Sequence, residues 1–188
     1  MMRIFKIHDV ASAPEKSHSI LEDALKNRGR IPNLYGVLAE SPQLLEAYVG
    51  LHKLFENSSF NKEELTVVWQ TINVEHECTY CVPAHTLIAK SMGVDSDIIE
   101  ALRNETFLPS DKLQVLHNTT LLIVRNRGVL TDAELERFYD VGYENRHLLD
   151  IVLGLSQKVI SNYVNHLAKT PLDNSSKKFA WTPKNPKY

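Results

Sequence analysis

Apolar residues recur at helical spacing through most of the chain, and no two segments alternate as paired strands do. Leu65, Val68 and Ile72 lie three or four positions apart, as on one face of a helix. The same spacing recurs between positions 151 and 163. Because no strand pair interrupts this pattern, the sequence predicts an all-α fold of about eight helices.

Polar caps and glycines mark where these helices begin and end. Ser41-Pro42 is typical of an N-cap followed by proline in the first turn, and Gly93 is typical of a helix end. We expect helices near 12–29, 33–40, 42–56, 78–92, 96–104, 111–127 and 146–169, with others opening at 61 and 131. Three pairs have capping-box spacing: Ser12 with Glu15, Asn61 with Glu64, and Thr131 with Glu134.

The last segment differs from the rest of the chain. Residues 171–188 hold three prolines and four lysines, with Phe179, Trp181 and Tyr188 between them. We therefore expect one helical domain over residues 1–170, followed by a tail that cannot form a core of its own. The simplest interpretation is a disordered end; its aromatic residues also allow docking on a neighbouring subunit.

Composition excludes several classes of function. The 188 residues carry a formal net charge of -2, which argues against the concentrated basic surface of a nucleic-acid-binding protein. No apolar run is long enough to span a membrane, and residues 1–10 have no signal-peptide pattern. We expect a cytoplasmic protein.

Candidate chemistry concentrates in one segment, which contains both cysteines. Cys78 and Cys81 are three positions apart, and Pro83 places the start of a helix close to them. Free amide groups at a helix start favour the thiolate, which is the nucleophilic form. His85, four positions after Cys81, lies on the same face and can act as a base. Glu75, three positions before Cys78, is the nearest carboxylate in sequence that could orient His85.

Two other interpretations of this segment remain open. Cys78, Cys81 and His85 could bind zinc with His76 as a fourth ligand, although structural zinc sites more often combine two separated ligand pairs. The cysteines could also be inert core residues beside a surface histidine. The combination of a CxxC pair, a helix start and an in-phase histidine favours redox chemistry.

The stretch Cys78-x-x-Cys81-x-x-x-His85 resembles the core motif of AhpD-like alkylhydroperoxidases, within the carboxymuconolactone decarboxylase-like superfamily. The likeness extends through the segments 64–73 and 91–94. The segments 162–166 and 170–173, and Ser41-Pro42 with Tyr48, resemble its peroxidase-related branch. The resemblance covers roughly residues 30 to 175. It implies an AhpD-like helical domain with the CxxC motif at a helix N-terminus, and a homo-oligomer that is a trimer or a multiple of one.

The resemblance also implies a thiol peroxidase of peroxiredoxin type. Cys81 would attack a small or alkyl hydroperoxide, Cys78 would resolve the sulfenic acid as a disulfide, and His85 would relay the proton. An external dithiol would then reduce the disulfide, so neither a metal nor an organic cofactor is required. Asn162, Asn165 and His166 could line the pocket or bind an acidic group, or they could satisfy an interface or a helix end.

One position departs from the motif. Family members place a relay glutamate about twelve residues before the first cysteine, and Thr66 stands there in this chain. We expect Glu75 to replace that glutamate, with Glu64 as the alternative. Two other functions remain open: a carboxymuconolactone decarboxylase-like lyase, whose chemistry needs no CxxC pair, and a non-catalytic oligomeric scaffold whose CxxC pair is a redox switch.

Overall fold

The computed structural model describes residues 5–184 and 186, and this part of the chain is helical without strands. The predicted all-α fold is confirmed. Eight α-helices have nine or more residues and one has six. They are α1 (His18–Arg28), α2 (Asn33–Leu38), α3 (Pro42–Glu56), α4 (Lys62–Glu75), α5 (Cys81–Ser91), α6 (Ser96–Asn104), α7 (Asp111–Arg125), α8 (Asp132–Asp140) and α9 (Asn145–Ala168), with 3-10 turns η1 (Glu15–Ser17) and η2 (Asn174–Phe179).

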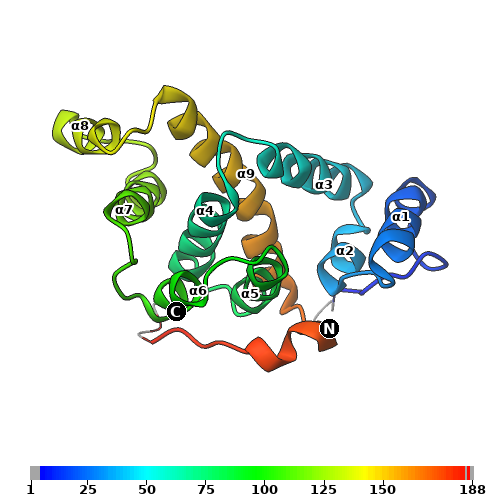
Figure 1. Cartoon of the computed structure of the whole chain (residues 1–188). Coiled ribbons are helices and arrows are strands. Elements are labelled where there is room, and N and C mark those ends of the chain that lie inside the picture. Colours follow the sequence, from blue (N-terminus) through cyan, green and yellow to red (C-terminus); the bar gives the residue numbers. More distant parts are fainter. Residues whose placement is uncertain (1–4, 185, 187–188) are drawn as a thin grey trace.

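Helix α4 is the centre of the arrangement, and α9 passes behind it (Figure 1). Helices α5, α6, α7 and α9 all pack on α4, while α3 lies along α9. Two apolar clusters result. The larger one surrounds Trp69 of α4, and the smaller one joins α1, α2 and α3 to Cys78 and Cys81. The cysteine pair therefore lies inside the molecule, where the N-terminal helices meet α5.

Two of the three predicted capping boxes form. Asn61 caps α4 by accepting from the Glu64 amide, and the Glu64 carboxylate accepts from the Asn61 amide. Thr131 and Glu134 do the same for α8. The third is absent, because Ser12 instead exchanges hydrogen bonds with Asp9 in a loop. Helix α1 consequently begins at His18 rather than near position 12.

The C-terminal tail packs on its own chain along the underside of α5 and α6 (Figure 1). The Trp181 indole donates to the Arg103 carbonyl over 2.9 Å, and Arg103 Nη1 donates to the Phe179 carbonyl over 3.2 Å. The expected disordered end is therefore wrong for the described part of the tail, because its aromatic residues find partners on α5 and α6. Docking on a neighbouring subunit stays a prediction, and Tyr188 lies outside the described residues.

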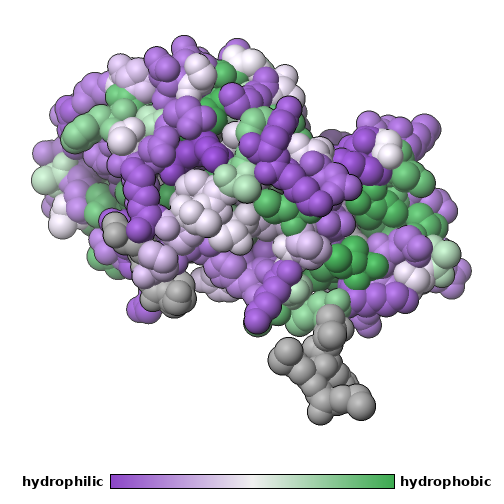
Figure 2. Space-filling view, turned by 90° about the horizontal axis from the view of Figure 1, so that it is seen from below, coloured by the Kyte–Doolittle hydropathy of each residue, from purple (hydrophilic) through white to green (hydrophobic). Residues whose placement is uncertain are grey.

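Seen from below, the molecule is largely hydrophilic near its centre, with apolar side chains gathered on the right over the N-terminal helices (Figure 2). Phe5, Ile7 and Leu25 are exposed apolar residues of this end. Within the described residues, every helix is too short or too polar to cross a membrane.

Candidate active site

A tight turn delivers the first cysteine from α4 to α5. The Cys78 amide donates to the Asn73 carbonyl over 3.0 Å, and the Glu77 amide donates to the Val74 carbonyl over 2.9 Å. This pair of bonds is a Schellman motif, with Glu77 at φ 53° in the position that glycine usually takes. The motif ends α4 and turns the chain inward, so that Cys78 is fully buried.

The second cysteine is the first residue of α5, as the proline position indicates. The Cys81 amide donates to Cys78 Sγ over 3.2 Å, and the Val82 amide donates to the Cys78 carbonyl over 3.0 Å. Pro83 is the third residue of the helix, where a missing amide hydrogen costs no helical bond. The predicted CxxC motif at a helix start is confirmed, and both cysteines are reduced.

Cys81 is the more acidic of the two thiols. Burial would raise the pKa of Cys81, but a hydrogen bond from Cys78, the charge of Lys158 and hydrogen bonds from Asn165 and Asn162 outweigh it. Together they lower the pKa to about 6. Asn165 Nδ2 donates to the Cys81 sulfur over 3.2 Å. Burial raises the pKa of Cys78 well above its ordinary value, so Cys81 is the thiolate of the pair.

Lys158 of α9 supplies the positive charge beside this thiolate. Its side chain is buried, and its Nζ lies 2.9 Å from His85 Nε2. Burial lowers the pKa of Lys158, and the two cysteines act in the opposite direction. Within the described residues, no carboxylate forms an ion pair with Lys158. The Cys81 thiolate is therefore its natural counterion.

His85 is held as a neutral ring. Burial and the charge of Lys158 keep the pKa of His85 well below its ordinary value, and the Trp69 ring packs against it at 4.9 Å between centroids. A protonated lysine only donates, so this contact makes His85 Nε2 an acceptor and places the ring hydrogen on Nδ1. His85 Nδ1 is buried and has no hydrogen-bond partner.

The two cysteines open onto different cavities. The first, the Cys81 cavity, measures about 90 Å³ and is lined by Cys81, His85, Lys158 and residues from α1, α2, α3 and the tail. The second, the Cys78 hollow, measures about 310 Å³ and is lined by Cys78, His166, Lys169 and other residues of the turn before α5 and of the end of α9. Cys81 therefore adjoins the first cavity, and Cys78 adjoins the second.

The expected contact between Glu75 and His85 does not form. Glu75 accepts from Arg125 of α7 over 3.0 and 2.7 Å. The Schellman turn changes the chain direction after Glu75, so the three-residue spacing to Cys78 does not place the two side chains together. With His85 Nε2 on Lys158 and His85 Nδ1 unpartnered, neither ring nitrogen is bonded to a carboxylate.

Glu64, the alternative carboxylate, does not contact His85 either. Glu64 caps its own helix, accepts from the Tyr143 hydroxyl over 3.1 Å and lies 3.5 Å from Lys112. Thr66 is buried and donates to the Lys62 carbonyl within α4. Lys158, rather than a glutamate, is the charged group bonded to His85.

A chain of hydrogen bonds between buried side-chain amides connects α4, α5 and α9. Asn162 Nδ2 donates to Asn73 Oδ1 over 3.0 Å, and Asn73 Nδ2 donates to Gln70 Oε1 over the same distance. Gln70 Nε2 then donates to the Val82 carbonyl over 3.1 Å. Asn162 therefore has a structural role beside Cys81, and His166 lines the Cys78 hollow.

The proposed fourth zinc ligand is engaged with α9. His76 Nδ1 lies 2.9 Å from Asn162 Oδ1. Across the described part of the chain, no three His, Cys, Asp or Glu side chains are grouped as metal ligands would be.

Sequence reasoning missed Lys158. This residue occupies the buried face of α9, at helical spacing from Ile151 and Gly154. A lysine in phase with apolar residues was the available signal, since lysine is rarely buried without a partner.

Comparison with known proteins gives matches in structure alone. No protein-family model matches the chain, and no curated protein matches it in sequence. Similar solved structures include the AhpD core of an uncharacterized peroxidase-related protein from Ralstonia eutropha JMP134, with a TM-score of 0.79 and 15% identity over 92% of this chain and 95% of that one. An uncharacterized peroxidase-related protein from Silicibacter sp. TM1040 has a TM-score of 0.78 and 18% identity over 94% and 97%.

A third similar structure is the debrominase Bmp8, solved as a cysteine-to-alanine variant in complex with 2,3,4-tribromopyrrole. It has a TM-score of 0.73 and 16% identity over 95% of this chain and 96% of that one. At such low identities, these TM-scores establish the fold alone. The chain therefore has the AhpD-like helical fold that its cysteine motif predicts.

Proposed function

We propose that this chain is a thiol-dependent peroxidase that reduces small organic hydroperoxides. The observation that carries the proposal is the buried set of Cys81, Lys158 and His85 around one cavity, with Cys78 bonded behind Cys81. Such a set combines a thiolate, its counterion, a proton donor and a second thiol. These are the groups that a two-cysteine peroxide reduction requires.

In the first step, the Cys81 thiolate attacks the terminal oxygen of the hydroperoxide. The O–O bond breaks, Cys81 becomes a sulfenic acid, and an alkoxide leaves. His85 donates its Nδ1 hydrogen to the alkoxide and accepts a proton from Lys158 at Nε2, a distance of 2.9 Å. The alcohol is released and Lys158 is left neutral.

In the second step, the Cys78 sulfur attacks the Cys81 sulfenic acid. A disulfide forms and water leaves, which accounts for both oxygen atoms of the peroxide. An external dithiol then reduces the disulfide. The regenerated Cys81 thiol gives its proton to His85 Nδ1 and His85 Nε2 returns its proton to Lys158, so that all three groups recover their starting form. We place the dithiol at the Cys78 hollow, because that side is separate from the Cys81 cavity.

Lys158 explains how the site can operate without the relay glutamate. A glutamate would make the histidine a stronger base, so that it takes the thiol proton. Here the cation stabilises the thiolate directly, and His85 only passes a proton on. The buried environment strengthens this attraction, because it excludes water from between the charges.

Peroxide oxidation of the cysteines, followed by mass spectrometry of each sulfur, tests this function. Wild-type protein should lose two hydrogens as a disulfide, and Cys78→Ser should gain one oxygen at Cys81. Cys81→Ser should consume no peroxide. Full consumption by Cys81→Ser would overturn the proposal, and an unreactive wild type would favour the scaffold alternative.

A second reaction is open to the same thiol pair. The rings of Tyr35, Tyr48 and Tyr80 line the Cys81 cavity, which suits a small flat substrate. The thiolate could take bromine from an aryl bromide, Cys78 would displace bromide to form the disulfide, and the ring would gain a proton. Bromide release from a bromopyrrole, without peroxide, distinguishes this reaction. The lyase alternative would consume its substrate with both cysteines replaced.

We also propose a homo-oligomer, a trimer or a multiple of one. Four apolar side chains of α9 are exposed along its length: Leu149, Val152, Tyr163 and Leu167. Exposed apolar side chains on one face of a helix are typical of protein contact surfaces. Analytical ultracentrifugation of wild type and Leu167→Glu tests the assignment, since the charge should dissociate subunits that meet along α9.

A further inference from the structure

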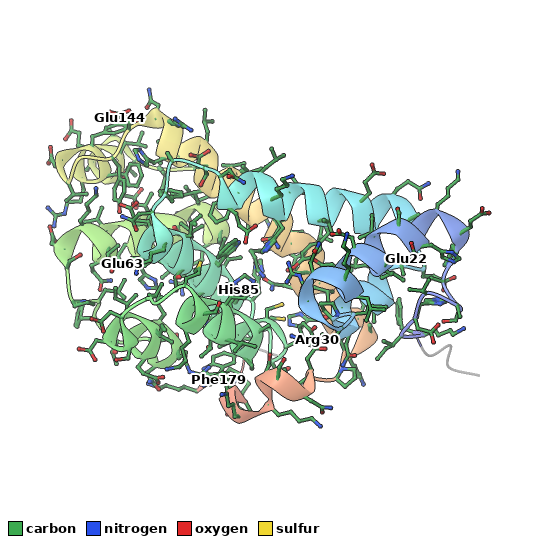
Figure 3. All side chains as sticks on the ribbon, turned by 45° about the vertical axis from the view of Figure 1, so that its right-hand side comes forward. Glu22, Arg30, Glu63, His85, Glu144 and Phe179 are labelled. Carbon is green, nitrogen blue, oxygen red and sulfur yellow. The ribbon has the colours of Figure 1, made fainter. Side chains whose placement is uncertain are left out.

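The Cys81 cavity has cationic groups at its outer end. Arg28 and Arg30 both line it, and Arg30 lies between the N-terminal helices and the tail, whereas His85 lies deeper in the molecule (Figure 3). Asp173 is the carboxylate among the lining residues. Glu56 lies near this end without lining the cavity, and its carboxylate is 3.3 Å from His52 Nε2.

The Asp173 carboxylate is already engaged. It accepts from the Tyr80 hydroxyl over 2.5 Å and from the Asn33 amide over 3.0 Å, and it lies 3.1 Å from Arg30 Nη1. These contacts tie the tail to α2 and α5. They engage both carboxylate oxygens, and Asp173 forms no ion pair with Arg28.

The two arginines retain capacity to bind an acceptor. Arg28 meets the Tyr35 ring at 5.8 Å and forms no ion pair with any described residue. Arg30 Nη1 forms an ion pair with Asp173 over 3.1 Å. At the inner end, His85 Nδ1 is a buried donor without an acceptor. Buried donors are normally satisfied, so this nitrogen points to a ligand acceptor at the inner end, and the charge of Arg28 suits an acidic group at the outer end.

We infer that the physiological hydroperoxide is a short-chain carboxylate, with its hydroperoxide group against Cys81 and His85 and its carboxylate against Arg28 and Arg30. A cavity of about 90 Å³ admits only a small molecule. Arginine suits the outer group because its planar fork pairs with carboxylate oxygens. This inference rests on the proposed peroxidase function and adds the substrate class.

A matched pair of substrates tests the inference on the full chain. The first is 4-hydroperoxy-4-methylpentanoate, and the second is its primary amide, which has nearly the same shape without the charge. At low ionic strength, wild type should prefer the acid about tenfold in kcat/KM, and 0.5 M NaCl should reduce that preference. In Arg28→Gln the acid-to-amide ratio of kcat/KM should fall to about 2 or below. The control is Lys26→Gln, which removes an exposed cation of α1 outside the cavity and should keep the wild-type ratio.

Binding of the alcohol products provides a second readout that does not depend on turnover. Calorimetry should find that 4-hydroxy-4-methylpentanoate binds wild type about tenfold more tightly than its amide does, and that Arg28→Gln removes the difference. Equal kcat/KM for both hydroperoxides, or a ratio unchanged in Arg28→Gln, would overturn the inference and leave the peroxidase function standing. Failure of both hydroperoxides to oxidise Cys81 would instead overturn the peroxidase function. Calorimetry would then be the remaining test of whether Arg28 and Arg30 bind a carboxylate.

Discussion

Lys158 Nζ lies 2.9 Å from His85 Nε2, and both side chains are buried beside Cys81. A buried lysine without a carboxylate partner is costly, unless another negative charge faces it. The Cys81 thiolate meets that requirement. Lysine and cysteine therefore stabilise each other's charged form, and the histidine between lysine and cavity can carry a proton outward.

Replacing Lys158 by methionine should remove most of the reactivity of Cys81 near neutral pH. Without the cation, burial dominates and the pKa of Cys81 rises from about 6 toward or above its ordinary value. We expect the rate of peroxide oxidation at pH 7 to fall at least about thirtyfold by stopped-flow measurement, since the thiolate fraction falls by that order. The free energy of unfolding should not decrease, because methionine fills the same space without a buried charge.

The matched control is Lys53→Met, which removes an exposed cation of α3 outside the cavity. It should oxidise at the wild-type rate. An unchanged pH midpoint for Cys81 in Lys158→Met would show that the thiolate is stabilised by its hydrogen bonds alone.

Alkylation of wild type by iodoacetamide should rise with pH around a midpoint near 6. Cys81 reacts as the thiolate, which predominates above its pKa and is protonated below it. We therefore expect about one-tenth of the maximal rate at pH 5 and nearly the maximal rate at pH 7.5. Cys78→Ser should retain an acidic midpoint, measured by mass spectrometry of the labelled peptide. A midpoint between 8 and 9 would contradict the thiolate assignment.

Glu75→Gln should leave peroxide consumption close to wild type. Its carboxylate is bonded to Arg125 on α7, away from the nitrogens of His85. Loss of this partly exposed pair should cost about 1 kcal/mol of unfolding free energy or less, by chemical denaturation. A tenfold loss of peroxide consumption in Glu75→Gln would show that the Glu75 carboxylate takes part in the reaction.

His85→Gln should lower kcat by about tenfold to a hundredfold, because the proton path from Lys158 is broken.

Tyr80→Phe should loosen the tail. The variant removes the hydroxyl that donates to Asp173, and leaves Asp173 with its hydrogen bond from Asn33 and its ion pair with Arg30. We expect faster amide hydrogen exchange across residues 171–180 and a loss of about 1–2 kcal/mol in unfolding free energy. Tyr139→Phe, which removes an exposed hydroxyl on α8, is the control. Equal exchange in both variants would mean that other contacts hold the tail.

Local sequence patterns were sufficient to predict most of the helices and to place Cys78, Cys81 and His85 together. Caps such as Asn61 with Glu64 act within one turn, so their spacing identifies a helix start in any fold. Cys81 and His85 share a face because four residues on one helix always do. These relationships depend on backbone geometry over a few residues, which is why Cys78, Cys81 and His85 could be found without a structure.

The rest of the site depended on long-range packing. Lys158 is 73 residues from His85 along the chain, and only the crossing of α9 behind α4 and α5 brings them together. Glu75 failed for a related reason, because Glu77 adopts a left-handed backbone conformation in which glycine is more usual, and the chain turns away. The motif thus predicted that Cys81 and His85 share one helix face, whereas the packing of separate helices set which charge lies beside Cys81, since a buried charge takes whichever partner the fold places beside it.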